Sequence, residues 1–217
     1  MIAPRNLFIP VSGDNLPRRL TQLIVGLVLF GAGIGLMLQS GLGVPPWDVL
    51  HQGLAVQFGM TIGIWSVIVS FALLVLWLPL KERFGIGTIL NAVIIGLTID
   101  ATAALVPEAE QIVTAGFMLG SGILLVGLAS GLYIGANLGP GPRDGLMTGI
   151  ARRGPSIRLT RSILEVVVLI SGWLLGGTFG VGTLAFAFLI GPLVQFFLPR
   201  CTVNTGRPED AWDHPAR

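Results

Sequence analysis

Six stretches of the chain are apolar over a length that can cross a membrane. A helix needs about 20 mostly apolar residues to cross roughly 30 Å of hydrocarbon. Charged residues make up only 11% of the 217 residues, against roughly 25% in an average soluble domain. The sequence therefore predicts an all-α membrane protein. The six stretches cover approximately Leu20–Gln39, Ile62–Leu80, Ile86–Val106, Ile112–Ala136, Leu159–Gly177 and Val181–Pro199.

The basic residues divide cleanly between the two sides of these stretches. If the N-terminus is cytoplasmic, all 13 Lys and Arg residues fall in cytoplasmic segments or at their edges, and the three outer connections hold none. Because positive residues concentrate in cytoplasmic loops, this partition predicts six spans with both termini cytoplasmic. Segment 1–19 would precede the first span, and the polar tail 201–217 is expected to be disordered.

A three-span unit occurs twice in the sequence. LGVPPWDVLHQGLA, which begins at Leu42, shares seven residues with LGPGPRDGLMTGIA, which begins at Leu138. FGIGT, from Phe84, matches FGVGT, from Phe179, and each of the two motifs opens an apolar stretch. The offset between the copies is 96 positions in the first match and 95 in the second. Two motifs in the same order at nearly the same offset indicate an internal repeat.

Each unit contributes three spans, which is an odd number. The second unit, at 111–200, would therefore enter the membrane from the face opposite to the first unit, at 20–110. The sequence thus predicts six transmembrane helices arranged as two inverted repeats. Segments Pro45–Phe58 and Pro142–Arg153 are too short to cross, and each is expected to form a short re-entrant or interfacial helix. Secondary transporters use this architecture and bind solutes near the midplane between the repeats.

The paired LGxxPxD segments and the repeated FG[IV]GT resemble the YczE/YyaS/YitT family of bacterial integral membrane proteins. The resemblance extends from about Leu20 to Pro199. It implies a multi-span protein of the bacterial plasma (inner) membrane. It implies no activity, catalytic residue or cofactor.

Asp48 and Asp144 are the first candidates for a solute or ion site. Each follows a proline by two positions and opens a short helix, where a carboxylate suits the positive helix end. One interpretation is a purely structural pair of helix-start carboxylates. The other is a cavity framed by the two helix breaks, because non-helical backbone within a membrane must be buried in protein or line water.

Arg143 and Trp47 occupy the same position of the two repeats, next to these aspartates. Arg143 could bind an anion beside a helix N-terminus, pair with Asp144, or serve only as a positive residue of the cytoplasmic side. Trp47 could stack on a solute or anchor its helix at the membrane interface.

Three polar residues within the spans complete the candidate site. Glu165 lies four residues after Arg161, so it could form a helical ion pair or take part in a relay of protons or cations. Asp100 and its repeat counterpart Gln195 are expected to face the bundle interior or a wet cavity, although Asp100 could also reach interfacial water.

Together these features predict a small-solute transporter or channel whose site lies between the repeats. The alternative is a non-transporting membrane scaffold or regulator of a partner protein. The sequence contains no nucleophile–base pair, cofactor fingerprint or metal-ligand spacing, so we expect neither an enzyme nor a cofactor. The arginines form no continuous basic face, which argues against nucleic acid as a partner. The expected partners are the lipid bilayer and an unknown small solute or ion of either charge, with a homo-oligomer as an option.

Overall fold

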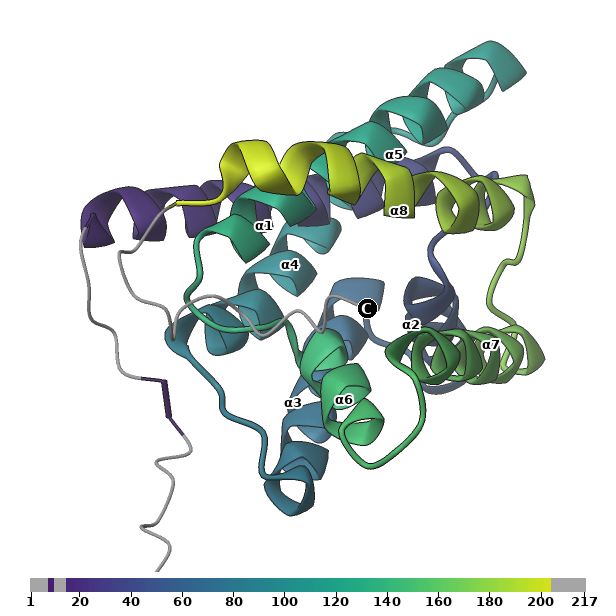
Figure 1. Ribbon diagram of the computed structural model, residues 1–217. Helices are drawn as coiled ribbons and strands as arrows, with labels where there is room; N and C mark the ends of the chain where they lie inside the picture. Colours follow the sequence, from purple (N-terminus) through teal and green to yellow (C-terminus); the bar gives the residue numbers. More distant parts are fainter. Residues whose placement is uncertain (1–7, 10–14, 204–217) are drawn as a thin grey trace, which may run out of the picture.

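The computed structural model describes residues 8–9 and 15–203 of the chain. Within these residues the fold is all-α, and its only β feature is an isolated bridge between Phe8 and Phe84. Eight helices follow one another along the described chain (Figure 1): α1 Leu16–Gln39, α2 Pro46–Phe58, α3 Ile62–Leu80, α4 Ile86–Leu105, α5 Ile112–Gly135, α6 Pro142–Ala151, α7 Ile157–Leu174 and α8 Val181–Cys201.

Five of these helices are long and apolar enough to cross a membrane, namely α1, α3, α4, α5 and α8. Their ends lie within a few residues of the predicted boundaries. Helix α7 misses the same criterion because its 18 residues include Arg158, Arg161 and Glu165. The all-α prediction is confirmed, and the sixth span and the inverted arrangement stay predictions. Most of segment 1–19 and of the tail 201–217 lies outside the described residues.

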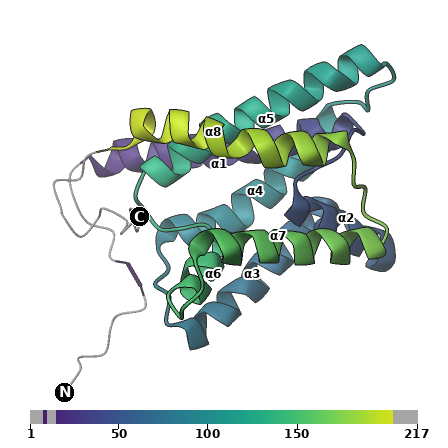
Figure 2. The same ribbon diagram turned by 45° about the vertical axis from the view of Figure 1, so that its right-hand side comes forward.

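The helices pack in two groups. Helices α4, α1, α5 and α8 form a row in which each packs against the next. Helices α2, α3, α6 and α7 form a closed ring, in which α2 packs on α3, α3 on α6, α6 on α7 and α7 on α2. In two views 45° apart, α1, α5 and α8 run together along one side of the molecule, with α6 and α7 on the other (Figures 1 and 2). Helix α4 joins the two groups by packing against α3.

Glycines set the close packing of the row. A Cβ added to Gly33 of α1 would lie 2.8 Å from the carbonyl oxygen of Gly122 in α5, and one added to Gly122 would lie 2.7 Å from that of Gly33. The two backbones can approach so closely because neither residue has a side chain. The GxxxG motifs pack in the same way: Gly31 and Gly35 lie against α4, and Gly127 and Gly131 lie against α8.

The short helices α2 and α6 begin at the predicted prolines, and the loops before them fold back into the molecule. Leu42 accepts a hydrogen bond of 2.7 Å from the amide of Gly182 at the start of α8, and Leu138 accepts one of 2.9 Å from Gly87 at the start of α4. Gly43 and Gly139 have φ values of 118° and 121°, which other residues rarely adopt. This geometry places the N-termini of α2 and α6 close to each other inside the molecule.

Most of the described basic residues lie at the start of α1 and at or just after the ends of α3, α6 and α8, and we call this end of the molecule (Figure 2) the basic end. Arg19 joins the start of α1 to the end of α5 through the carbonyl oxygens of Ala136 and Asn137. Gln22 of α1 reaches the carbonyl of Cys201 at the end of α8. An ion pair of 3.2 Å between Glu82 and Arg152 joins the ends of α3 and α6.

Candidate functional site

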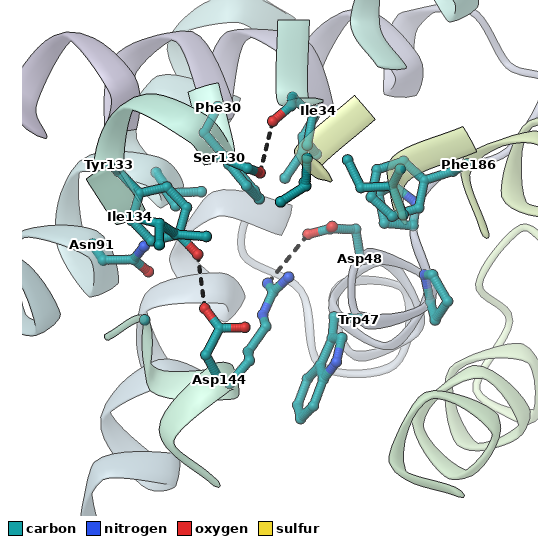
Figure 3. A pocket seen from close by; sticks show the side chains of 18 of the residues that line it. Phe30, Ile34, Trp47, Asp48, Asn91, Ser130, Tyr133, Ile134, Asp144 and Phe186 are labelled. Atoms are coloured by element: carbon teal, nitrogen blue, oxygen red, sulfur yellow. Dashed lines mark hydrogen bonds and ion pairs between the residues drawn. The ribbon is translucent and has the colours of Figure 1, made fainter. Parts of the chain in front are cut away.

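A cavity of about 290 Å³ lies where α2 and α6 begin. Its polar wall carries Asp48 and Trp47 from α2, Arg143 and Asp144 from α6, and Tyr133 from α5. Figure 3 shows the labelled side chains of Asp48, Asp144 and Tyr133 turned toward the same space. The two helix-start aspartates of the sequence analysis therefore converge on one cavity, although they are 96 residues apart.

Asp48 is the most buried acid of the cavity, with 1% of its surface exposed. Its Oδ1 lies 3.0 Å from Nδ1 of His51, one turn later on α2, and 3.6 Å from Nη2 of Arg143. Its Oδ2 has no hydrogen-bond partner among the described residues. A buried carboxylate oxygen without a donor is costly, so this atom is suited to receive a donor from a ligand.

Arg143 crosses from α6 to the α2 side of the cavity. It forms its ion pair with Asp48 rather than with its neighbour Asp144, because consecutive residues of a helix point in different directions. Its guanidinium carbon lies 5.3 Å from the centre of the Trp47 ring. Trp47 is 6% exposed, so its ring is buried beside Arg143.

Asp144 occupies the corresponding place on α6. The hydroxyl of Tyr133 donates a hydrogen bond of 2.7 Å to its Oδ2. Tyr133 itself is held in the row of long helices, where its ring packs edge-on against Phe30 at 5.9 Å between centroids. The contact therefore ties the start of α6 to α5.

Helices α3 and α7 supply the next part of the wall from corresponding positions. Arg161 donates from Nε to Oε1 of Glu165 at 2.8 Å, which confirms the helical ion pair, and both residues line the cavity. The residues 95 positions earlier in the chain are Ser66 and Ser70 of α3, and they line the same cavity. At these corresponding positions α3 therefore carries small neutral side chains, and α7 carries large charged ones.

The last two candidates of the sequence analysis are separated by the structure. Gln195 of α8 lines the cavity, whereas Asp100 of α4 is not part of its lining. Asp100 accepts a hydrogen bond from the Thr61 hydroxyl and one of 2.8 Å from the amide of Gly63, so it fixes the start of α3 against α4.

Sequence reasoning missed several residues of the site. His51 was not among the candidates, although its place one turn after Asp48 was the available signal. Tyr133 lies in an apolar stretch, and no pattern in the sequence marked it. Ser66 and Ser70 could have been found from their offset to Arg161 and Glu165. Among the described residues, no three His, Cys, Asp or Glu side chains lie close enough together to hold a metal ion.

Comparisons with known proteins place the chain in a family. The profile described as "Family of unknown function (DUF6198)" matches residues 17–199, which include all eight helices except the first residue of α1 and the last two of α8. The chain belongs to this family. Both LGxxPxD segments of the chain lie inside the region that matches the DUF6198 family.

Three relatives extend the comparison. The chain is 43% identical to an "Uncharacterized protein" of Haemophilus influenzae over 182 residues, 83% of this chain and 84% of the relative. It is 36% identical to the "Uncharacterized membrane protein YczE" of Bacillus subtilis over 191 residues, 86% and 88% of the two chains. It is 30% identical to the "Uncharacterized protein YyaS" of Bacillus subtilis over 183 residues, 81% and 90%.

These relatives confirm the YczE and YyaS parts of the resemblance, and the YitT part stays a prediction. The name of YczE and the five apolar helices identify a multi-pass membrane protein. No solved structure matches the chain.

Proposed function

We propose that the chain is a transporter of a small solute, with its binding site in the cavity between two inverted three-span repeats. The observation that carries the proposal is the makeup of the cavity wall. Residues at the repeat offset line it in pairs: Trp47 with Arg143, Asp48 with Asp144, Ser66 with Arg161, Ser70 with Glu165, and Ile95 with Ile190.

Two half-helix N-termini that meet in the interior support a binding site at this place. Discontinuous helices of transporters present their N-termini and free backbone groups to a solute near the bilayer midplane. Helices α2 and α6 begin at the cavity, and the loops before them are fastened to α8 and α4 of the other repeat. A channel through the same interior would share this lining.

The proposal makes α7 the sixth span. An isolated charge at the bilayer centre costs roughly 2.5–3.5 kcal/mol or more, but Arg161 and Glu165 face each other and the cavity. Both termini then lie on the side of the basic end, which we assign to the cytoplasm of a bacterial plasma membrane. The proposal includes no catalytic step and no cofactor. It leaves a homo-oligomer open.

Uptake into vesicles tests the proposal. The purified full chain is reconstituted and supplied with a panel of labelled amines, amino acids, carboxylates and inorganic ions. We expect uptake of at least one solute above empty vesicles. The variant with both Asp48→Asn and Asp144→Asn is expected to lose at least about tenfold of that rate, since it removes two carboxylates from the wall.

Glu108→Gln is the matched control, because it removes an exposed carboxylate from the loop between α4 and α5. Tyr133→Phe removes only one hydroxyl and serves if the double variant does not fold. Uptake that equals that of empty vesicles for the whole panel would favour the scaffold or regulator. Unchanged uptake by the double variant would reject the site.

A further inference from the structure

We infer that the solute carries a protonated amine. This inference rests on the proposed site and names its substrate class. Three carboxylates and two guanidinium groups line the cavity. Arg143 already faces Asp48 and Arg161 already faces Glu165. Asp144 is bonded to the hydroxyl of Tyr133, so the lining has one carboxylate more than it has guanidinium groups.

The unpartnered Oδ2 atom of Asp48 favours a ligand that donates hydrogen bonds. Asp48 lines the cavity, is 1% exposed, and its Oδ2 lacks a donor among the described residues. An ammonium group supplies both a positive charge and N–H donors, and such charge-assisted bonds are roughly twice as strong as neutral ones. A quaternary ammonium has no N–H to offer. An anion would have to draw Arg143 away from Asp48 and leave that carboxylate buried without a counter-charge.

The helix N-termini do not reverse this preference, because α2 and α6 each carry their own aspartate in the first turn. The positive helix end is thereby matched within each helix. The opposite wall is apolar and includes Ile34, Val126 and Ile190. A short alkyl chain attached to the amine fits this wall.

Binding to the purified full chain tests the amine. The probes are butylamine, butyltrimethylammonium and butyrate at neutral pH, measured by calorimetry. We expect butylamine to bind at least about tenfold more tightly than either other probe, and Asp48→Asn to weaken it by at least about tenfold while Glu108→Gln does not. Tighter binding of butyrate, equal binding of the three probes, or no binding of butylamine at millimolar concentration would overturn the inference. Uptake of anions alone would retain the transporter and reject the amine.

A second inference comes from an independent observation, the unequal packing of the two proposed repeats. Helix α3 packs closely on α4, where a Cβ added to Gly63 or to Gly96 would collide with the carbonyl oxygen of the other residue. Asp100 stabilises this helix–helix contact, which we call the α3–α4 seam, by accepting hydrogen bonds from Thr61 and Gly63. Ser66 and Ser70 are buried behind it. The α3–α4 seam is therefore closed at the end opposite the basic end.

The corresponding seam between α7 and α8 is open. Helices α7 and α8, both fully described, lack the packing that joins α3 to α4. A Cβ added to Gly191, the counterpart of Gly96, would meet nothing within 4 Å. The side chains of Arg161 and Glu165 are 53% and 29% exposed. Figure 2 shows the two helices running one above the other, joined at the end far from the α1 start.

The join between α7 and α8 is held in place, so the opening faces the basic end. The amide of Thr178, in the α7–α8 loop, donates a hydrogen bond of 2.8 Å to Gln52 of α2, and Gly182 bonds to Leu42. The cavity is lined further along α8 by Val194 and Gln195, toward the basic end. We propose that the repeats exchange these packings, so that α7 closes on α8 as α3 parts from α4, and the cavity opens to the opposite side.

The exchange predicts a second set of polar contacts, between α7 and α8, that corresponds to the contacts of Asp100 between α3 and α4. Ser156 caps α7 as Thr61 caps α3, and Gln195 stands at the position of Asp100. In the exchanged state Ser156 and Gln195 would hold the α7–α8 seam. Two packings of the same helices can lie close in free energy, and a ligand shifts the balance between them by its differential affinity.

Disulfide trapping in membranes tests the exchange in a Cys201→Ser background. One variant combines Thr61→Cys with Asp100→Cys, and the other combines Ser156→Cys with Gln195→Cys. We expect both pairs to form a disulfide with a mild oxidant, detected by mass spectrometry of peptides, the second pair at least about tenfold more slowly. Ser162→Cys with Gln195→Cys is the control for random collisions. Failure of the second pair to exceed this control would overturn the exchange, whether or not any solute is transported.

Discussion

Replacing Gly145 tests how α6 is held at the cavity. A Cβ added to Gly145 would overlap Cζ2, Cη2 and Cε2 of the fully buried Trp77 of α3. Trp77 also donates a hydrogen bond of 3.0 Å from Nε1 to the carbonyl of Pro142, the first residue of α6. This contact lies one residue before Arg143, so the ring positions the half-helix that carries the polar wall.

The expected cost of Gly145→Ala follows from this geometry. The added methyl group forces the indole or the α6 backbone to move, which costs about 1–3 kcal/mol of unfolding free energy. Trp77→Phe alone removes the outer ring atoms and the hydrogen bond, and we expect it to cost about 2–4 kcal/mol. In the Trp77→Phe background the methyl group meets no outer ring, so Gly145→Ala should cost less than about 0.5 kcal/mol. The double-mutant cycle therefore predicts a coupling of at least about 0.5 kcal/mol.

The assay is reversible unfolding of the purified chain in mixed detergent micelles, followed by circular dichroism. Gly120→Ala on α5 is the control, because a Cβ there would meet nothing within 4 Å. Costs of the two substitutions that simply add in the double variant would refute the packing argument. A cost for Gly145→Ala no greater than that of Gly120→Ala would do the same.

Two further predictions concern other parts of the fold. Gly122→Ala should destabilise the chain by about 1–3 kcal/mol, because its methyl group would press on the backbone of α1. Gly120→Ala should leave stability unchanged or raise it by up to about 1 kcal/mol. Equal effects of the two substitutions in the unfolding assay would contradict the close α1–α5 contact. Burial raises the pKa of Glu82, against the opposing effect of Arg152, so its protonated form favours the folded state. The stability of the parent relative to Glu82→Gln should be highest below pH 4.5 and fall as the pH rises through the raised pKa; a difference that stays constant or grows with pH in thermal melts would reject this.

The positions of the helices could be predicted from the sequence, because the residue patterns that mark a helix are local. Apolar length located the long helices, and the prolines at 46 and 142 marked the starts of α2 and α6, where proline needs no amide partner. The threonines of FGIGT and FGVGT cap α4 and α8 through bonds of 3.1 Å from Gly85 and 3.4 Å from Gly180. Each of these features depends on residues within one turn of each other.

The contacts between side chains within the cavity could not be predicted from such local signals. The distance between Arg143 and Asp48 depends on two loops that fold back and are held by Gly182 and Gly87 on helices far along the chain. The only carboxylate partner that the sequence suggested for Arg143 was therefore its neighbour Asp144, as one of three interpretations. The bond from Tyr133 to Asp144 depends on the same loop and was equally hidden.

The unequal seams were encoded in the repeat but required a comparison of side-chain volume and charge. Where α3 has Gly63, Ser66 and Ser70, α7 has Arg158, Arg161 and Glu165. Closing α7 on α8 would take the exposed Arg161–Glu165 pair out of water, which is costly for charged groups. Parting α3 from α4 would expose only small groups and one aspartate. The charged helix therefore favours the state in which its own seam is open, and a bound solute would have to offset this preference for the cavity to open to the other side.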